Sequence, residues 1–220
     1  GGKNGFGAKL TNIFSKEFIV ETIDSKLKKH YRQVFSDNMS KKSEPEIKTT
    51  KDSSYTMISF IPDYSKFGFS KITNDLISLF SKRVFDIAAS TCKSVKVYLN
   101  GELIKIKSFT DYISLYYETI PKSLTYVEDT DRWKIGVIFD NTIGFSQVSF
   151  VNGILTYNGG THVNYIVDQL CDKLSDVILK KNKNLKIKKE QIKTNITIFL
   201  DCSIEDPAFN SQVKDKLTTK

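Results

Sequence analysis

The chain has 220 residues, of which 40% are hydrophobic and 26% are charged, and its formal net charge is +8. This balance excludes an intrinsically disordered chain, and the length suits one or two domains. The sequence contains no run of about 18 consecutive apolar residues, so we expect no membrane-spanning helix. The positive charge favours a polyanionic partner such as nucleic acid, but lysines that only solvate the surface account for it equally well.

The cysteine content argues against disulfides and against zinc. Cys92, Cys171 and Cys202 are odd in number, lie far apart and lack CxxC spacing. They predict a reducing compartment and no zinc site. Only three residues are arginine, so the basic charge is almost entirely lysine. Lysine contacts phosphate as a point charge, which favours sequence-independent contact over base readout.

The first third of the chain is predicted to mix helix and strand. A helix is expected over residues 10–14, directly after a glycine-rich opening. Apolar and β-branched runs predict strands over residues 18–23 and 55–61, and the polar stretch 41–54 between them is expected to be a loop. Because the sequence opens inside a glycine-rich motif, we expect it to be part of a longer protein.

A helix and a hairpin are predicted next. Apolar residues recur at helical spacing over residues 72–87. Residues 95–99 then alternate into Asn100-Gly101, a pair typical of a tight hairpin turn. The pattern restarts with an aromatic-rich helical stretch at Ser108, and we therefore place a domain boundary near residue 107.

The second half is predicted to contain strands over residues 133–139 and 145–151, followed by a long helix after Gly159-Gly160. Thr161 is predicted to be the N-cap of that helix. Residues 196–204 alternate between apolar and polar side chains, which predicts a half-buried strand.

The opening G-G-K-N-G-F-G-A-K-L is the first candidate site. Gly1, Gly2, Gly5 and Gly7 let backbone N–H groups converge on an anion, and Lys9 adds positive charge. The spacing matches neither a Walker A loop nor a dinucleotide fingerprint. By pattern alone, a phosphate-binding loop and a cluster of turn glycines fit these residues about equally well.

Several segments resemble the type II DNA topoisomerases of eukaryotes and large DNA viruses. The opening GGKNGFGAKLTNIFS resembles their phosphate-binding loop and following helix, QVSFVNGILTYNGGTHV (147–163) resembles their transducer signature, and IEDPAFNSQVK (204–214) resembles their ATP-sensing loop. Shorter matches recur at residues 37–39, 65–67, 85–91 and 95–101. The resemblance covers essentially the whole chain.

This resemblance implies an α+β fold in two parts. Residues 1–107 would be the later half of a GHKL ATPase domain, a partial α/β sandwich. Residues 108–220 would be a transducer domain similar to the second domain of ribosomal protein S5. Other GHKL proteins, such as gyrase B and MutL, and a non-enzymatic basic DNA-binding module remain alternative interpretations.

The resemblance also implies which residues bind ATP, namely Gly2, Lys3, Asn4, Gly5, Phe6, Gly7, Ala8, Lys9, Gln212, Val213 and Lys214. Lys214 would reach the γ-phosphate from the transducer. Three positions depart from the usual family pattern: Lys3 replaces arginine, Phe6 replaces tyrosine, and Val213 replaces a threonine and so removes a hydroxyl. Without the resemblance, Lys214 is one more lysine in a charged tail.

Leu179, Lys180 and Lys181 end the long helix where the family contacts double-stranded DNA, although lysines there also suit the helix dipole. His162 is not predicted to be catalytic, because a strand-to-helix turn explains it. The family's general-base glutamate, its Mg²⁺-holding asparagine and its DNA-cleaving tyrosine have no counterpart in this sequence. We therefore expect the isolated chain neither to hydrolyse ATP nor to cleave DNA.

For the whole protein, the resemblance implies ATP-driven passage of one DNA duplex through a transient double-strand break in another. It also implies ATP and Mg²⁺ as cofactors, a homodimer without membrane contact, and a location in the nucleus or, for a virus, in the viral factory or virion.

Overall fold

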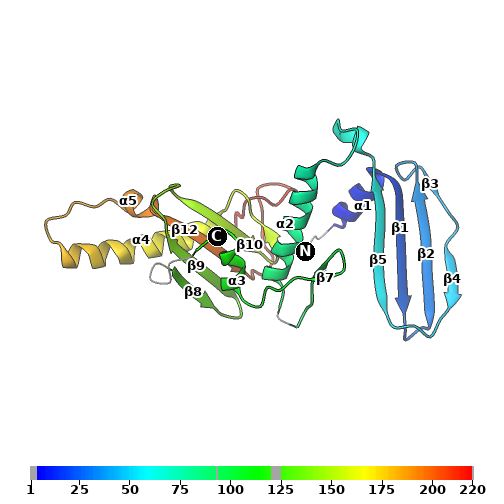
Figure 1. Cartoon of the computed structure of the whole chain (residues 1–220), viewed down its shortest axis with the longest axis horizontal. Helices are drawn as coiled ribbons and strands as arrows, with labels where there is room; N and C mark the ends of the chain where they lie inside the picture. Colours follow the sequence, from blue (N-terminus) through cyan, green and yellow to red (C-terminus); the bar gives the residue numbers. More distant parts are fainter. Residues whose placement is uncertain (1–3, 93, 120–124, 220) are drawn as a thin grey trace. The chain divides into compact units, whose positions relative to one another are not determined.

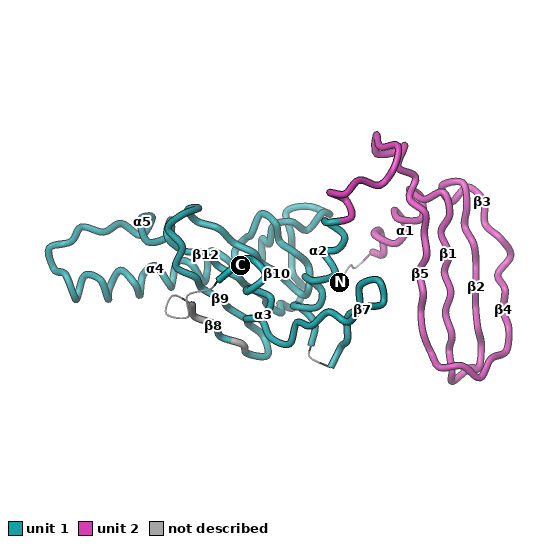
Figure 2. The backbone as a smooth tube through the Cα atoms, in the orientation of Figure 1, with its two compact units in different colours: residues 1, 78–220 teal, residues 2–77 magenta. Residues whose placement is uncertain are grey.

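A computed structural model describes residues 4–92, 94–119 and 125–219. The chain forms two compact units, residues 2–77 and residues 78–220 (Figure 2). Both units combine helices with mainly antiparallel sheets, which confirms the α+β fold class. Within the described residues, no helix is both long and apolar enough to cross a membrane.

The unit of residues 2–77 is built on an antiparallel sheet (Figure 1). Its strands lie in the order β3-β2-β1-β5, and β4 also pairs with β2. Its elements are α1 (Phe6–Ile13), β1 (Ser15–Asp24), β2 (Lys29–Ser36), β3 (Lys41–Lys42), β4 (Glu46–Thr49), β5 (Tyr55–Pro62) and a 3-10 helix (Tyr64–Phe67). The predicted strands at 18–23 and 55–61 are confirmed as the central part of β1 and as β5.

Phe18 is the buried centre of this sheet. Its ring lies 6.4 Å from that of Phe35 on β2 and 6.3 Å from that of Phe60 on β5, so one aromatic row crosses three strands. Strand β2 was not predicted, and the predicted loop 41–54 contains β3 and β4. Both strands are short and fully exposed, so they lack the apolar alternation that marks a strand in the sequence.

The unit of residues 78–220 begins within α2 (Asn74–Ser90), which confirms the helix predicted over 72–87. Its remaining elements are β6 (Tyr98–Leu99), β7 (Glu102–Leu103), α3 (Phe109–Ser114), β8 (Thr125–Asp129), β9 (Trp133–Phe139), β10 (Ser146–Val151), β11 (Ile154–Leu155), α4 (Thr161–Lys181), α5 (Lys189–Lys193) and β12 (Ile196–Cys202). Strands β6 and β7 form the predicted hairpin, with Asn100 and Gly101 both at positive φ.

The main sheet of this unit has the strand order β11-β10-β12-β9-β8. Strand β12 pairs antiparallel with β9 and parallel with β10. A parallel pair requires a long crossover connection, and α4 supplies it between β10 and β12. The helix packs on one face of the sheet, where Val163 and Val167 meet Ile198 and Leu200.

Helix α3 covers the opposite face. Phe109, Tyr112 and Ile113 pack there with Phe150 and Phe199. The helix begins with a capping box between Ser108 and Asp111, which satisfies backbone N–H groups at its start.

The strand predicted to be half-buried is in fact buried on both faces. All seven residues of β12 are buried, including Thr197 and Asp201 on the side predicted to face water. The prediction was wrong because α3 covers this side and Lys134 Nζ pairs with Asp201 Oδ2 at 3.1 Å. A second correction concerns α4, whose N-cap is Gly160 rather than Thr161.

A buried polar network joins α2 to α3. The carboxylate of Asp86 accepts hydrogen bonds from Lys82 Nζ at 2.9 Å and from Tyr112 Oη at 2.7 Å, and the hydroxyls of Tyr112 and Tyr116 lie 2.8 Å apart. Asp86 is 1% exposed, so these partners replace the water that a buried carboxylate requires. Burial, the leading cause, also raises the pKa of the Tyr112 phenol far above its ordinary value.

We predict that Phe199→Ala lowers the free energy of unfolding by about 3–5 kcal/mol. Phe199 is 1% exposed and its ring lies 5.1 Å from that of Tyr116, so truncation leaves a cavity between β12 and α3. Urea unfolding measures the change. Tyr157→Ala is the control, because Tyr157 is 78% exposed and should change stability by less than about 0.5 kcal/mol. Equal losses in both variants would contradict the placement of Phe199 in the core.

Candidate nucleotide and DNA contact sites

The glycine-rich segment leads directly into helix α1. Gly2 and Lys3 lie outside the described residues. Asn4 and Gly5 precede the helix, and residues 6–9 form its first turn. The predicted helix start at residue 10 was therefore one turn too late, and Phe6, Gly7, Ala8 and Lys9 are helical rather than part of a loop.

The start of α1 fits a phosphate group. Gly5 is the N-cap with φ 65°, a conformation that glycine adopts without strain. The N–H of Lys9 bonds to Gly5 O at 3.3 Å, which leaves the N–H groups of residues 6–8 without acceptors within the helix. Residues 4–10 are all exposed, and a Cβ placed on Gly5 or Gly7 would meet no atom within 4 Å. The backbone can therefore approach an anion closely.

Gln212, Val213 and Lys214 lie together at the tip of the Q-V-K loop, which we define as residues 203–219 after β12. The side chains of Gln212 and Val213 are exposed, and that of Lys214 is half-buried. The Lys214 N–H donates to Ser211 O at 3.1 Å, and Lys214 has φ 63°, a conformation uncommon outside glycine.

Leu179, Lys180 and Lys181 form the last turn of α4, and all three are exposed. The first residues of α4 contact the base of the Q-V-K loop, since Thr161 N donates to Leu217 O at 3.2 Å. The predicted ATP-sensing residues and the predicted DNA-contacting residues are thus attached to opposite ends of one helix. Twenty-one helical residues span about 30 Å.

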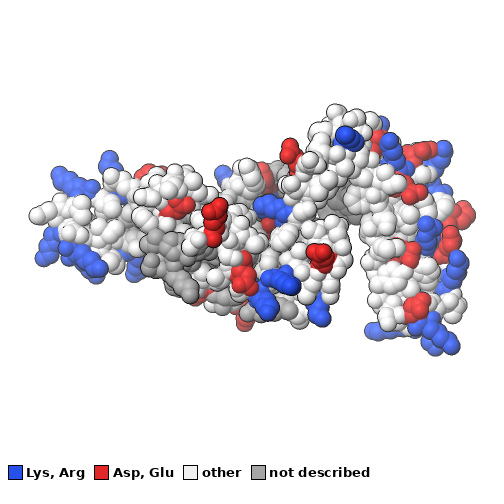
Figure 3. All heavy atoms as spheres, in the orientation of Figure 1, with Lys and Arg blue, Asp and Glu red and all other residues white. Residues whose placement is uncertain are grey.

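The two lysines belong to a larger basic cluster, which we call the lysine end and define as residues 180–193. It holds seven lysines and one acidic residue, a net charge of +6 against +8 for the whole chain. Figure 3 shows these basic side chains gathered where α4 ends. The end of the helix pattern pointed only to the first lysines of this cluster, although the density of lysines along the sequence marks the rest.

The lysine end is held in place by packing. Ile187 and Ile192 join the apolar core beneath α4. The ammonium of Lys193 lies 4.8 Å from the centre of the Phe145 ring. Lys189 pairs with Asp172 on α4. These contacts attach residues 187–193 to α4 and to the core beneath it.

His162 is a buried structural residue. It is 3% exposed, and its Nε2 lies 3.1 Å from Thr156 Oγ1, which also contacts Ser149. Burial lowers its pKa to about 4, so the imidazole is neutral near pH 7.

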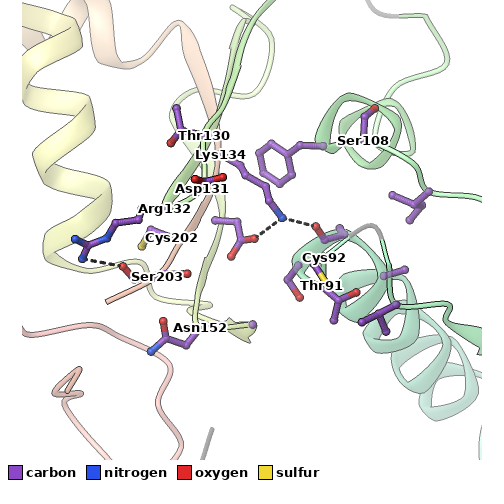
Figure 4. A pocket seen from close by; sticks show the side chains of 18 of the residues that line it. Thr91, Cys92, Ser108, Thr130, Asp131, Arg132, Lys134, Asn152, Cys202 and Ser203 are labelled. Carbon is purple, nitrogen blue, oxygen red and sulfur yellow. Dashed lines mark hydrogen bonds and ion pairs between the residues drawn. The ribbon is translucent and has the colours of Figure 1, made fainter. Parts of the chain in front are cut away.

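A cavity of about 910 Å³ lies at the C-terminal end of α2, among β9, β12 and neighbouring turns (Figure 4). Lys134 Nζ donates to Ala89 O and to Asp201 Oδ2, both at 3.1 Å, and Arg132 donates to Ser203 O at 3.4 Å. Of the predicted site residues in the same compact unit, Gln212, Val213, Lys214, Leu179, Lys180 and Lys181 lie outside its lining.

Metal-binding groups are not clustered in the part of the chain that the structure describes, where no three His, Cys, Asp or Glu side chains could hold one ion.

Comparison with known proteins identifies the family. The family model for DNA gyrase B matches residues 105–220. DNA topoisomerase 2 from Arabidopsis thaliana is 48% identical to this chain over 230 residues, and DNA topoisomerase 2 from Acanthamoeba polyphaga mimivirus is 46% identical over 224 residues. Each match covers 100% of this chain but only 15% and 18%, respectively, of those proteins.

Solved structures agree. The ATPase region of Saccharomyces cerevisiae topoisomerase II has a TM-score of 0.91 at 45% identity, with 100% of this chain and 56% of that chain covered. The ATPase and transducer domains of topoisomerase II from Balamuthia mandrillaris have a TM-score of 0.92 at 39% identity, with 100% and 57% covered. The sequence and the fold therefore place this chain with the ATPase and transducer regions of type II topoisomerases.

The chain belongs to the DNA gyrase B family, in its eukaryotic and viral DNA topoisomerase 2 branch. It spans less than a fifth of the length of these two curated relatives.

We predict that His162 makes the stability of this fold sensitive to acid. The unfolded imidazole binds a proton near pH 6.5, whereas the folded one does so only near pH 4. Between these two values only the unfolded state binds the proton. The free energy of unfolding is therefore unaffected by His162 above pH 6.5 and decreases as the pH falls from 6.5 towards 4. His162→Gln should therefore show a flatter dependence of unfolding free energy on pH across this window in urea titrations. If the unfolding free energies of the two proteins change with pH in parallel, the lowered pKa of folded His162 is contradicted.

Proposed function

We propose that this chain is the ATP-binding and transducer part of a type IIA DNA topoisomerase. The whole protein would use ATP binding and hydrolysis to drive passage of one DNA duplex through a transient double-strand break in another. The observation that carries the proposal is the arrangement of α4, with the Q-V-K loop bonded at its start and the lysine end at its finish.

In this proposal, residues 1–107 are the later half of the GHKL ATPase domain and residues 108–220 are the transducer. Two observations support a boundary there: the gyrase B match begins at residue 105, and the capping box of α3 begins at Ser108. The compact units instead divide between residues 77 and 78, because Ala89 near the end of α2 packs into the core beneath α3.

The nucleotide would be ATP. The start of α1 supports phosphate contacts from residues 4–9, and Gly2 and Lys3 extend the same segment. Gln212, Val213 and Lys214 would contact ATP from the Q-V-K loop, with the Lys214 ammonium at the γ-phosphate. Mg²⁺ would accompany ATP with a protein ligand outside this chain. Bound ATP would supply the energy of the cycle through hydrolysis, and this chain's residues would bind and orient its phosphates.

The DNA contact would be the lysine end, beginning with Leu179, Lys180 and Lys181. Its dense lysine charge supports sequence-independent contact with the phosphates of a duplex. The full-length protein would act as a homodimer without membrane contact, in the nucleus of a cell or in the factory or virion of a large DNA virus.

We predict that Lys214→Ala in the full-length protein lowers the kcat of ATP hydrolysis roughly 100-fold, because one donor to a developing phosphate charge is lost. Steady-state ATPase assays with and without duplex DNA measure the loss. Lys216→Ala is the matched control, because its side chain is exposed only two residues away. Equal turnover in the two variants would refute the γ-phosphate role.

We predict that the double variant Lys180→Gln/Lys181→Gln binds duplex DNA more weakly than this chain. We also expect its affinity to depend less steeply on salt concentration. Each lost phosphate contact should reduce the slope of log Kobs against log salt by about 0.9, so the double variant should lose about 1.8. Fluorescence anisotropy with a labelled duplex between 50 and 200 mM salt gives the slope. The control is Lys26→Gln/Lys51→Gln, which removes two exposed lysines from the other unit. A slope that falls equally in both would show that the contact is not local to α4.

A further inference from the structure

The backbone at Lys214 must be held by its surroundings. Its φ of 63° lies in the left-handed region, where a side chain with a Cβ is disfavoured. Such a residue keeps this conformation only when neighbouring contacts over-determine it, and residues of this kind concentrate at functional sites. The bond from Lys214 N to Ser211 O closes the turn within the loop.

Asn158 supplies the outside contact. Its Nδ2 donates to Asp215 Oδ2 at 2.5 Å, and its backbone N–H donates to Asp215 O at 2.8 Å. The other carboxylate oxygen of Asp215 accepts from Ser211 Oγ at 3.5 Å. Asn158 therefore hydrogen-bonds to both the side chain and the main chain of the residue directly after Lys214.

Asp215 is suited to this contact because it is charged. The hydrogen bond from Asn158 is the largest of the causes that hold its carboxyl pKa below the ordinary value. Hydrogen bonds to an ionised acceptor are stronger than those between neutral groups. The pair is also long-range, since its members are 57 positions apart in the sequence, so it fastens the loop to a separate part of the chain.

The base of the loop is fastened by a second set of bonds two residues further on. Leu217 N donates to Gly159 O at 3.0 Å, and Thr161 N donates to Leu217 O. Leu217 is 1% exposed in a core with Val151. A Cβ on Gly160 would lie 2.3 Å from Leu217 O, so only glycine permits this approach.

We propose that Asn158 and Asp215 are positioning residues for Lys214. With Leu217 fixed against the Gly159-Gly160 turn, the Asn158–Asp215 contact sets where the chain leaves the core and forces the left-handed turn at Lys214. This turn directs the Lys214 side chain to the γ-phosphate. The inference rests on the proposed function, since it assigns the pair a role in recognising the terminal phosphate of ATP.

Two ligands that differ by one phosphate, an ATP analogue and ADP, separate a positioning role from a merely structural one. A positioning role predicts weaker binding of a non-hydrolysable ATP analogue and unchanged binding of ADP, because ADP lacks the phosphate that Lys214 would reach. A merely structural role predicts that both affinities change together. A small displacement of a group in a charged site can lower the rate 100-fold, so we expect kcat to fall roughly tenfold or more.

The test uses the full-length protein with Asn158→Ala, Asp215→Ala and the conservative Asp215→Asn. The alanine variants should lose roughly tenfold or more in analogue affinity and in kcat, with ADP affinity unchanged. Asp215→Asn keeps an acceptor oxygen for Asn158, so this variant should retain most of the wild-type analogue affinity and most of the wild-type kcat. Tyr157→Ala is the control, because it changes a 78% exposed side chain beside Asn158. Since Asn158 is exposed, we expect its variant to keep the wild-type Tm, so it carries the test alone if Asp215→Ala does not fold.

Lys214→Ala, measured in parallel, separates the two proposals. If Lys214→Ala leaves the preference for analogue over ADP intact, the γ-phosphate assignment itself is wrong and the positioning role falls with it. If Lys214→Ala abolishes the preference while Asn158→Ala leaves it intact, the positioning role alone is overturned. Support requires that both reduce the preference and that Asn158→Ala has no further effect in the Lys214→Ala background.

Discussion

The complete burial of β12 is the constraint on which the rest of its unit depends. The strand has paired neighbours on both sides and a helix over each face, with Phe199 under α3 and Ile198 and Leu200 under α4. A one-residue slip would exchange these two sets of side chains, which the packed faces forbid. The strand therefore determines where α3 and α4 pack on the two faces of the sheet. Its end also sets the point where the Q-V-K loop begins.

The position of α4 follows from this constraint. The helix is the crossover between β10 and β12, and its inner face packs on β12 through Val163 and Val167. Its first turn holds the Q-V-K loop, and its last turn begins the lysine end. Under the proposed function, nucleotide and DNA would act on two ends of one rigid element. Any coupling between them would then be reciprocal, so DNA would alter ATP affinity by the factor by which ATP alters DNA affinity.

Sequence patterns predicted the elements with strong apolar periodicity. Helices α2 and α4 and strands β1, β5, β9 and β10 were predicted within a few residues, because each carries a clear core-facing set. Strands β2 and β8 and helix α5 were missed. The eight residues of β2 include only three large apolar or aromatic side chains, and α5 has five residues, which is too short for a helical period to be seen.

Tertiary contacts, not local patterns, explain the remaining errors. Thr197 and Asp201 alternate with apolar residues as on a solvent-facing strand, but α3 covers this side and the distant Lys134 pairs with Asp201. The Asn158–Asp215 contact was equally hidden. Its members are 57 residues apart, and each is an ordinary polar residue in a turn or loop. Family resemblance pointed to Lys214, but only the fold reveals what surrounds it.

The Q-V-K loop divides into an anchored base and an exposed tip. Leu217 is almost fully buried, whereas Val213 is 80% exposed. The replacement of the usual threonine by Val213 therefore leaves the base unchanged, since the bonds that hold it involve Asn158, Asp215 and Leu217. A loop built in this way keeps its geometry independent of its tip residues. Under the proposed function, its tip can therefore be specialised for contact with a ligand without cost to the fold.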